Sequence, residues 1–200
     1  MARKAGTDRE QTRSQLLRSA LQEFTENGYE KASLRTISAN AGVTTGALYF
    51  FFRDKEDLLA QCVSPLTDYV LQTLQDYAAG EEYDKDASYR MSCRLLERVE
   101  ECPQEVSILL HHRDLPLVIR FYDDVIEQLD RRHHKLFERN GADLTILNQT
   151  TLHWTSHLEL ESFLQIISHQ TEGSDVKKQL RNMLWFMQGG IDELLERSRG

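Results

Sequence analysis

Apolar residues recur every three or four positions along almost the whole chain, and stretches of strict alternation are absent. This spacing predicts helices and no strands. A first helix is expected to continue up to Asn27 and Gly28, a pair that typically ends helices. The apolar stripe of this helix consists of Leu16, Leu17, Ala20, Leu21 and Phe24.

A turn between two short helices follows this first helix. Leu34, Ile37 and Ala41 lie on one face of the helix before the turn. Gly42 can adopt the left-handed backbone conformation that ends this helix. Thr44 can cap the next helix, because its hydroxyl oxygen can accept a hydrogen bond from an unpaired backbone N–H. Two short helices joined in this way are typical of a DNA-binding helix-turn-helix.

The helix after the turn has one side that faces the core and other sides that do not. Leu48 and Phe52 are four residues apart and are expected to face the core together. Tyr49 and Phe50 project from other faces of the same helix. This helix is therefore the element expected to contact DNA.

The rest of the chain is also predicted to be helical, which makes the protein all-α. Polar segments at 80–86 and 171–174, together with the pair Asn140 and Gly141, mark the expected breaks. The expected helices lie at 55–79, 87–102, 103–112, 116–139, 143–168 and 175–197.

The last of these helices carries apolar residues on more than one side. Leu180, Met187 and Ile191 belong to a stripe at helical spacing, whereas Trp185 and Phe186 fall outside that stripe. A helix that is apolar on two sides is buried on both, so one side can pack on a second subunit. The alternative is the central helix of a monomer. The residues predicted for a homodimer interface are Leu158, Trp185, Phe186, Gly189 and Gly190.

Charge is distributed unevenly along the chain. The net charge is -8, but residues 1–55 hold nine Lys and Arg against six Asp and Glu. This segment therefore carries +3, and the rest of the chain carries -11. A basic first segment on an acidic body is typical of a nucleic-acid-binding end joined to a domain with another task. Chance fluctuation is the alternative, because +3 is small.

Candidate metal and thiol chemistry is sparse. His153 and His157 are four residues apart on an expected helix, with Glu161 one turn further on, and this spacing can bind zinc. Polar side chains on a partly exposed helix are the alternative, because a fourth ligand is missing. The three cysteines are widely spaced without a C-x-x-C pair, which favours reduced thiols. No metal site is therefore predicted.

Sequence features of enzymes and membrane proteins are also missing. No nucleophile elbow, phosphate-binding glycine loop or dinucleotide-binding fingerprint occurs, so no catalytic residue and no cofactor is predicted. The apolar runs fall short of the ~20 residues that span a bilayer. The N-terminal residues are polar through Ser14, unlike a signal peptide. These features predict a soluble, cytoplasmic protein without membrane association.

The first part of the chain resembles the TetR family of bacterial transcription regulators, from about Leu16 to Leu59. The resemblance is specific, because many residue types recur at fixed spacing over about forty positions, unlike a single short motif. The residues that carry it are Leu17, Ala20, Leu21, Phe24, Gly28, Tyr29, Ser33, Leu34, Arg35, Ile37, Ala41, Gly42, Val43, Gly46, Leu48, Tyr49, Phe52, Lys55 and Leu58.

The resemblance implies which residues contact DNA. The start of the second short helix faces the major groove in this family, whereas Tyr49 and Lys55 match positions that hold phosphates. Many family members carry His or Tyr at the position of Phe51, which cannot donate a hydrogen bond. Three consecutive phenylalanines cannot all point inward on a helix, so Phe50 or Phe51 is expected near the DNA, packing on thymine methyl groups. The DNA-binding residues implied by the resemblance are Ser33, Arg35, Thr44, Thr45, Gly46, Tyr49, Phe50 and Lys55.

The resemblance also implies an architecture and a function. Residues 1–53 would form a helix-turn-helix DNA-binding domain, and residues 54–200 a helical domain that binds a small molecule and dimerises. The expected homodimer represses transcription from a palindromic double-stranded DNA operator until an unidentified small-molecule effector releases it. A DNA-binding regulator or architectural protein without a ligand, and an all-helical enzyme, are the alternatives. Apolar and aromatic positions expected to contact the ligand are Tyr69, Met91, Leu95, Leu110, Phe121, Tyr122, Val125 and Trp154.

Overall fold

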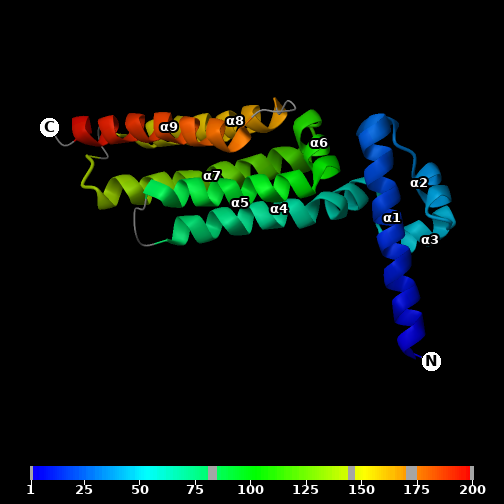
Figure 1. Ribbon diagram of the computed structural model, residues 1–200. Helices are drawn as coiled ribbons and strands as arrows, with labels where there is room; N and C mark the ends of the chain where they lie inside the picture. Colours follow the sequence, from blue (N-terminus) through cyan, green and yellow to red (C-terminus); the bar gives the residue numbers. More distant parts are fainter. Residues whose placement is uncertain (1, 81–84, 144–146, 170–174, 199–200) are drawn as a thin grey trace. The chain divides into compact units, whose positions relative to one another are not determined.

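A computed structural model describes residues 2–80, 85–143, 147–169 and 175–198 of this 200-residue chain. Every regular element in these ranges is a helix, which confirms the predicted all-α class. None of these helices is long and apolar enough to cross a membrane. The predicted turn at 171–174 and most of the predicted loop at 80–86 lie outside the described residues. In chain order the helices are α1 (Ala2–Lys31), α2 (Leu34–Asn40), α3 (Thr45–Phe51), α4 (Lys55–Ala79), α5 (Lys85–Glu101), α6 (Pro103–His111), α7 (Pro116–Arg139), α8 (Gln149–Ser168) and α9 (Val176–Ser198) (Figure 1).

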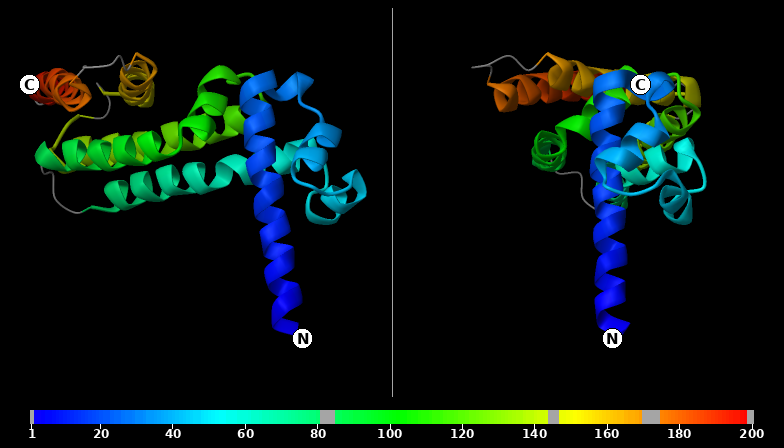
Figure 2. Two further views of the ribbon diagram at one scale, coloured as in Figure 1. Left: turned by 45° about the vertical axis from the view of Figure 1, so that its right-hand side comes forward. Right: turned by 90° about the vertical axis from the view of Figure 1, so that its right-hand side faces the viewer.

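One compact unit comprises Met1–Asp68 and Cys102–Val118. In this unit α1 packs against α2 and α6, and α2 packs against α3 (Figure 2). The pair Leu48 and Phe52 is fully buried, as the spacing predicts. Burying a side chain of this size contributes about 1.5–3 kcal/mol relative to leaving it exposed, so α3 is held firmly by its inner side. The α1 side chains that complete this core are Leu16, Ala20 and Phe24.

Local signals end and begin the short helices where the sequence predicts. Gly28 has φ 74°, which breaks the helical geometry near the end of α1, and Gly42 has φ 72° in the turn after α2. Ser33 caps α2, where its Oγ accepts a hydrogen bond of 3.4 Å from the backbone N–H three residues further on. Thr44 caps α3 in the same way at 3.2 Å. These contacts fix the turn that presents α3.

A second compact unit comprises Tyr69–Glu101 and Ile119–Gly200. In it α9 packs against α5 and α8 (Figure 1). Two clusters of buried apolar side chains form the core of this unit. The buried members of the first cluster, from α4, α5 and α7, are Leu74, Met91, Leu95, Val125 and Leu129. The second cluster joins the end of α7 to α8 and α9 around the fully buried Phe137.

Two helices contribute residues to both units. The helix α4 continues past Asp68, and α7 begins in the first unit before its longer part joins the second. The short helix α6 belongs to the first unit although it lies far from α1 in the sequence. The predicted division of the chain between residues 53 and 54 stays a prediction.

The helix α8 begins later than the sequence pattern predicts. The pattern places its start at Asp143, but the helix begins at Gln149. Asn148 caps it, because Oδ1 of this residue accepts a hydrogen bond of 3.1 Å from the N–H of Thr151. The preceding Leu147 is buried in the second apolar cluster. The predicted start is therefore wrong, because a buried anchor and an adjacent cap together fix the start of the helix.

Candidate functional site

The outer side of α3 carries two large exposed side chains. Tyr49 is 54% exposed and Phe50 is 67% exposed, although the neighbouring Leu48 is fully buried. Large aromatic side chains usually bury most of their surface, so such a pair on a firmly held helix indicates a contact surface. The buried inner side of α3 and its capped start keep this pair facing outwards.

The other residues predicted to bind DNA lie around this pair in the first unit. Those that are exposed are Arg35, Thr44 and Gly46, whereas Ser33 and Thr45 are half-buried. The hydroxyl of Ser33 is used as the cap of α2, and its backbone N–H donates to the carboxylate of the buried Glu23 at 3.1 Å. The structure therefore brings these residues to the turn and the adjacent helix starts, and their contact with DNA stays a prediction.

An arginine of α1 reaches the exposed aromatic side chains of α3. The guanidinium carbon of Arg9 lies 4.8 Å from the ring centroid of Phe50 and 5.9 Å from that of Phe51. The two rings meet edge to face, with centroids 5.4 Å apart. Arg13, one turn further on, donates to Oε1 of Gln61 at 2.6 Å and lies close to Phe52. The sequence reasoning did not identify Arg9. The available signal was that Arg9 and Arg13 are four residues apart and so lie on one face of the first helix.

Lys55 begins α4 and is bound within the first unit. Its Nζ donates to the carbonyl oxygens of Glu30 at 3.1 Å and Ala32 at 3.2 Å. The same ammonium lies 4.6 Å from the ring centroid of Tyr29. A cation at these carbonyls is favourable because the backbone dipoles at the end of a helix present partial negative charge. The predicted contact of Lys55 with a DNA phosphate stays a prediction beside this structural role.

None of the residues predicted to contact a ligand lines the cavity that is described below. Met91, Leu95 and Val125 are buried in the first apolar cluster of the second unit, and Phe121 packs against that cluster. Tyr122 is half-buried, and Tyr69 and Trp154 are exposed. Leu110 belongs to the first unit. Their predicted role stays a prediction.

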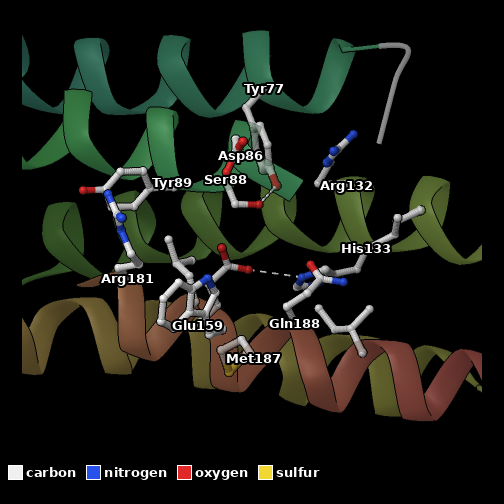
Figure 3. Close-up of a pocket in the computed structure, with 14 residues that line it drawn as sticks. Tyr77, Asp86, Ser88, Tyr89, Arg132, His133, Glu159, Arg181, Met187 and Gln188 are labelled. Atoms are coloured by element: carbon white, nitrogen blue, oxygen red, sulfur yellow. Dashed lines mark hydrogen bonds and ion pairs between the residues drawn. The ribbon is translucent and has the colours of Figure 1, made fainter. Parts of the chain in front are cut away.

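A cavity of about 220 Å³ lies in the second unit among α4, α5, α7, α8 and α9 (Figure 3). Tyr77 and Ser88 line one part of it, with their hydroxyl oxygens 2.5 Å apart. Apolar side chains of α7 and α9 line another part. The sequence reasoning did not find this cavity, because its lining comes from helices that are far apart in the sequence. These apolar side chains are Leu136, Leu184, Trp185, Met187 and Ile191.

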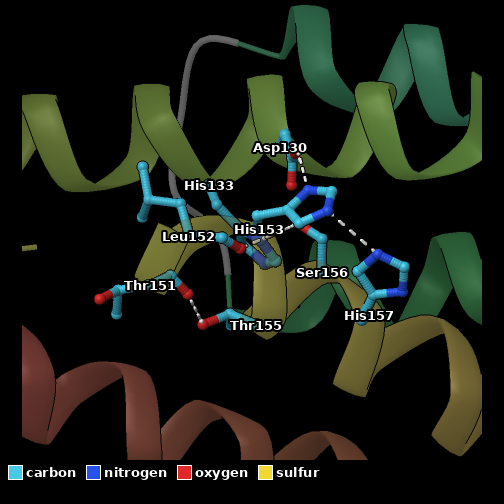
Figure 4. A network of polar contacts seen from close by, with 8 residues as sticks. All are labelled: Asp130, His133, Thr151, Leu152, His153, Thr155, Ser156 and His157. Atoms are coloured by element: carbon cyan, nitrogen blue, oxygen red, sulfur yellow. Dashed lines mark hydrogen bonds and ion pairs between the residues drawn. The ribbon is translucent and has the colours of Figure 1, made fainter. Parts of the chain in front are cut away.

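A buried histidine joins two helices at the wall of this cavity. Nε2 of His133 lies 3.2 Å from Oε2 of Glu159, and its Nδ1 lies 2.9 Å from Oγ of Ser156 (Figures 3 and 4). This set has the composition of a hydrolase triad. However, Ser156 is fully buried, and its Oγ also lies 3.2 Å from the carbonyl oxygen of Leu152. No substrate can reach this hydroxyl, so the set connects helices and performs no nucleophilic chemistry.

The histidine pair on α8 forms a separate polar network. Nε2 of His153 lies 3.2 Å from Nε2 of His157, and Nδ1 of His153 lies 2.9 Å from Oδ2 of Asp130 (Figure 4). In the described part of the chain, no three or more His, Cys, Asp or Glu side chains are grouped so that they could hold a metal ion. The pair therefore lacks the further ligands that a zinc site requires.

An exposed apolar surface lies on α8 and α9. Leu158 is 48% exposed, and Trp185 and Phe186 are 67% and 81% exposed. Gly189 and Gly190 follow one turn later, and a Cβ added at either glycine would meet no atom within 4 Å beyond its chain neighbours and the adjacent backbone of its own helix. The residues predicted for a dimer interface therefore lie on the surface of this unit, where small residues leave room for another helix.

Comparison with known proteins points to one group. A family model for bacterial regulatory proteins of the tetR family matches residues 16–62. The chain is 43% identical over 61 residues to the HTH-type transcriptional regulator AcrR of Shigella flexneri, an alignment that covers 30% of this chain and 28% of AcrR. It is 27% identical over 157 residues to the HTH-type transcriptional regulator TtgR of Pseudomonas putida, covering 74% of this chain and 70% of TtgR.

Solved structures extend the similarity over most of the fold. SmeT, the repressor of the Stenotrophomonas maltophilia multidrug efflux pump SmeDEF, matches with a TM-score of 0.68. The two sequences are 20% identical, and the superposition covers 89% of each chain. The family match is thus confined to the segment that contains α2 and α3, whereas the shared fold includes the second unit.

Proposed function

Because the chain belongs to the TetR family of bacterial regulatory proteins, we propose that it is a homodimeric repressor that a small-molecule ligand releases from its operator. The observation that carries DNA binding is the outer side of α3, where Tyr49 and Phe50 are more than half exposed. A rigid helix with an exposed aromatic face is suited to enter the major groove, which admits one α-helix.

In this proposal the contacts divide between bases and phosphates. Phe50 packs on thymine methyl groups in the major groove, and Tyr49 reaches a phosphate through its hydroxyl. Thr44 and Gly46, both exposed at the start of α3, lie close to the base edges. Arg35 supplies an exposed positive charge at the start of α2 for a second phosphate contact.

Arg9 extends the same surface from α1. Its guanidinium lies 4.8 Å from the ring centroid of Phe50, where cation and ring attract each other by about 0.5–1 kcal/mol at an exposed site. The arginine therefore favours one orientation of the ring and places a positive charge beside it. We assign Arg9 a positioning role for Phe50 and an electrostatic role toward the DNA backbone.

The dimer in this proposal forms through α8 and α9. Leu158, Trp185 and Phe186 supply exposed apolar area, and Gly189 and Gly190 allow the partner helix to approach closely. Two protomers would then place their α3 helices in successive major grooves, about 34–36 Å apart, as helix-turn-helix dimers do on palindromic sites. Replacing both Trp185 and Phe186 by Ala is expected to give a monomer in sedimentation analysis. The matched control replaces Ile119, an exposed apolar residue of α7, and leaves the dimer intact.

The ligand in this proposal binds in the cavity of the second unit. SmeT, whose fold is similar, is known in a complex with triclosan. One state of the dimer would have its two α3 helices spaced so that they do not fit successive major grooves. A ligand that binds this state more tightly shifts the population toward it and lowers the affinity for DNA. The affinity for DNA and the affinity for the ligand are then linked reciprocally.

The decisive experiment is a DNA titration at several salt concentrations. Bound duplexes are first selected from a random-sequence library, and the enriched palindrome is then titrated by fluorescence anisotropy. The logarithm of the binding constant is expected to fall linearly with the logarithm of the salt concentration, because Lys and Arg release counterions from phosphates. Failure to bind at low salt, or a flat salt dependence, would contradict the proposal.

A further inference from the structure

One buried arginine in the second unit has no ion-pair partner among the residues that the structure describes. Arg132 of α7 is 5% exposed and lines the cavity (Figure 3). Its guanidinium carbon lies 4.4 Å from the ring centroid of Tyr77, and its buried Nε has no hydrogen-bond partner in the described part of the chain. Arginine keeps its proton at any ordinary pH, and a largely buried charge without an ion-pair partner is costly. The guanidinium is therefore suited to receive an anion.

The two carboxylates at the cavity wall do not supply this counter-charge. Glu159 directs one oxygen to Nε2 of His133 at 3.2 Å, and no ion pair joins it to Arg132. Asp86 likewise forms no ion pair with Arg132 among the described residues, and the nearby exposed guanidinium of Arg181 lies over the ring of Tyr89. The positive charge of Arg132 therefore remains available to a molecule that enters the cavity.

The rest of the cavity limits the size and polarity of such a molecule. Leu136, Leu184, Met187 and Ile191 form an apolar wall, and the hydroxyls of Tyr77 and Ser88 provide polar contacts. The volume of about 220 Å³ is below the roughly 300–1,000 Å³ that is typical of sites for drug-sized ligands. The site thus suits a small molecule with one anionic group and an apolar body.

We infer that the cavity binds a small organic carboxylate, with the carboxylate on Arg132 and the apolar body against α9. A planar carboxylate accepts paired hydrogen bonds from a guanidinium, which matches the unpaired Nε. A neutral ligand would leave the charge of Arg132 uncompensated, and a cation would have to displace His133 from Glu159. The inference rests on the proposed function only in taking this cavity as the effector site.

The test uses the full chain and a series of probes with the same ring. Benzoate, benzamide and benzamidine carry negative, neutral and positive groups, and phenylacetate is a second carboxylate. Isothermal titration is expected to show binding of the carboxylates only. Replacing Arg132 by Met is expected to weaken carboxylate binding about ten- to a hundredfold, the effect of losing hydrogen bonds to a charged group. The control, Arg131→Met, removes an exposed arginine that is paired with Glu127 and leaves the affinity unchanged.

A second readout separates a binding role from a purely structural one. Without ligand, Arg132→Met is expected to melt at or above the temperature of the unaltered protein, because the substitution removes an uncompensated buried charge and keeps an apolar stem on Tyr77. If the arginine had a purely structural role, its replacement would instead lower the melting temperature. Should Arg132→Met not fold, Arg132→Lys is expected to fold and to keep carboxylate selectivity with reduced affinity.

Specific outcomes overturn the inference. A carboxylate site is excluded if benzamide or benzamidine binds as tightly as benzoate. It is also excluded if neither carboxylate binds at concentrations up to about 10 mM, at which a site with a Kd near 1 mM is mostly filled. Release of the operator DNA by each probe is measured in a separate titration, which tests the effector role of the cavity. Carboxylate binding that depends on Arg132 but leaves the DNA complex intact supports the site and contradicts its effector role. Release of DNA by a ligand that is not a carboxylate supports the proposed function and overturns this inference.

Discussion

Replacing Lys55 by Met is expected to destabilise the first compact unit by about 1–3 kcal/mol. The ammonium of Lys55 donates to the carbonyl oxygens of Glu30 and Ala32 and lies over the ring of Tyr29. A hydrogen bond from a charged donor contributes about 1.5–3 kcal/mol, and exposure to solvent reduces this figure. One of these two bonds is partly buried and the other is exposed. The expected loss is therefore close to that of one shielded bond.

The substitution isolates the charged group of the side chain. Met keeps an unbranched apolar stem of similar length, so packing against Tyr29 is largely preserved. Urea unfolding followed by circular dichroism measures the change in the free energy of unfolding. The matched control is Lys31→Met, because Lys31 is an exposed lysine in the last turn of α1. That control is expected to change the stability by less than about 0.5 kcal/mol.

The same variant decides between two roles of Lys55. A residue whose main task is a phosphate contact would leave stability unchanged and reduce the salt slope of DNA binding by about one phosphate. A residue that joins α4 to the end of α1 would lower stability in the absence of DNA. An unchanged free energy of unfolding together with a reduced salt slope would refute the structural reasoning.

Further variants and a labelling experiment test the DNA surface, a capping carboxylate and a buried thiol. Phe50→Ala is expected to weaken operator binding more than non-specific binding, and Arg9→Gln to do so to a smaller extent; an unchanged ratio of the two affinities would contradict this. Asp57 accepts hydrogen bonds from the N–H of Arg53 and from Gln61, which lower the pKa of its carboxyl below 3.8. The unaltered protein is thus expected to be more stable than Asp57→Asn, with the full difference in free energy of unfolding above pH 3.8. This difference is expected to shrink as the pH falls through the lowered pKa, and unfolding curves measured at a series of acidic pH values would show it. Burial raises the pKa of Cys62 to about 12, so in folded protein iodoacetamide is expected to alkylate the half-buried Cys93 well before Cys62, and equal rates by mass spectrometry would count against this reasoning.

The sequence predicted the features that depend on neighbouring residues. Ser33 and Thr44 cap their helices, and Gly42 has the positive φ that its turn requires, because each of these contacts is made within three or four residues. The α8 start shows the limit of such reasoning. Both Asp143 and Asn148 can cap a helix, and the burial of Leu147 among side chains of α7 and α9 favours the second position. That burial is a contact between distant segments, which periodicity does not reveal.

The candidate ligand site was out of reach for the same reason. Tyr77, Arg132 and Glu159 are each polar residues on an amphipathic helix, where an exposed position is the ordinary expectation. Only the packing of α4, α7 and α8 in one unit makes them neighbours of a cavity. Among the residues predicted to bind ligand, Met91, Leu95 and Val125 are buried in a core cluster and Phe121 packs against it. Apolar periodicity marks burial and does not separate a core from a pocket wall.

The departure at Phe51 illustrates how a distant contact can replace a local one. A phenylalanine cannot supply the polar group that His or Tyr supplies there in many TetR proteins. The structure places the guanidinium of Arg9 within 5.9 Å of the Phe51 ring and 4.8 Å of the Phe50 ring. A positive charge on the outer side of α3 thus comes from a different helix, α1. The loss of a polar residue at Phe51 and the position of Arg9 are consistent with one arrangement, in which α1 contributes the charge and α3 contributes the aromatic surface.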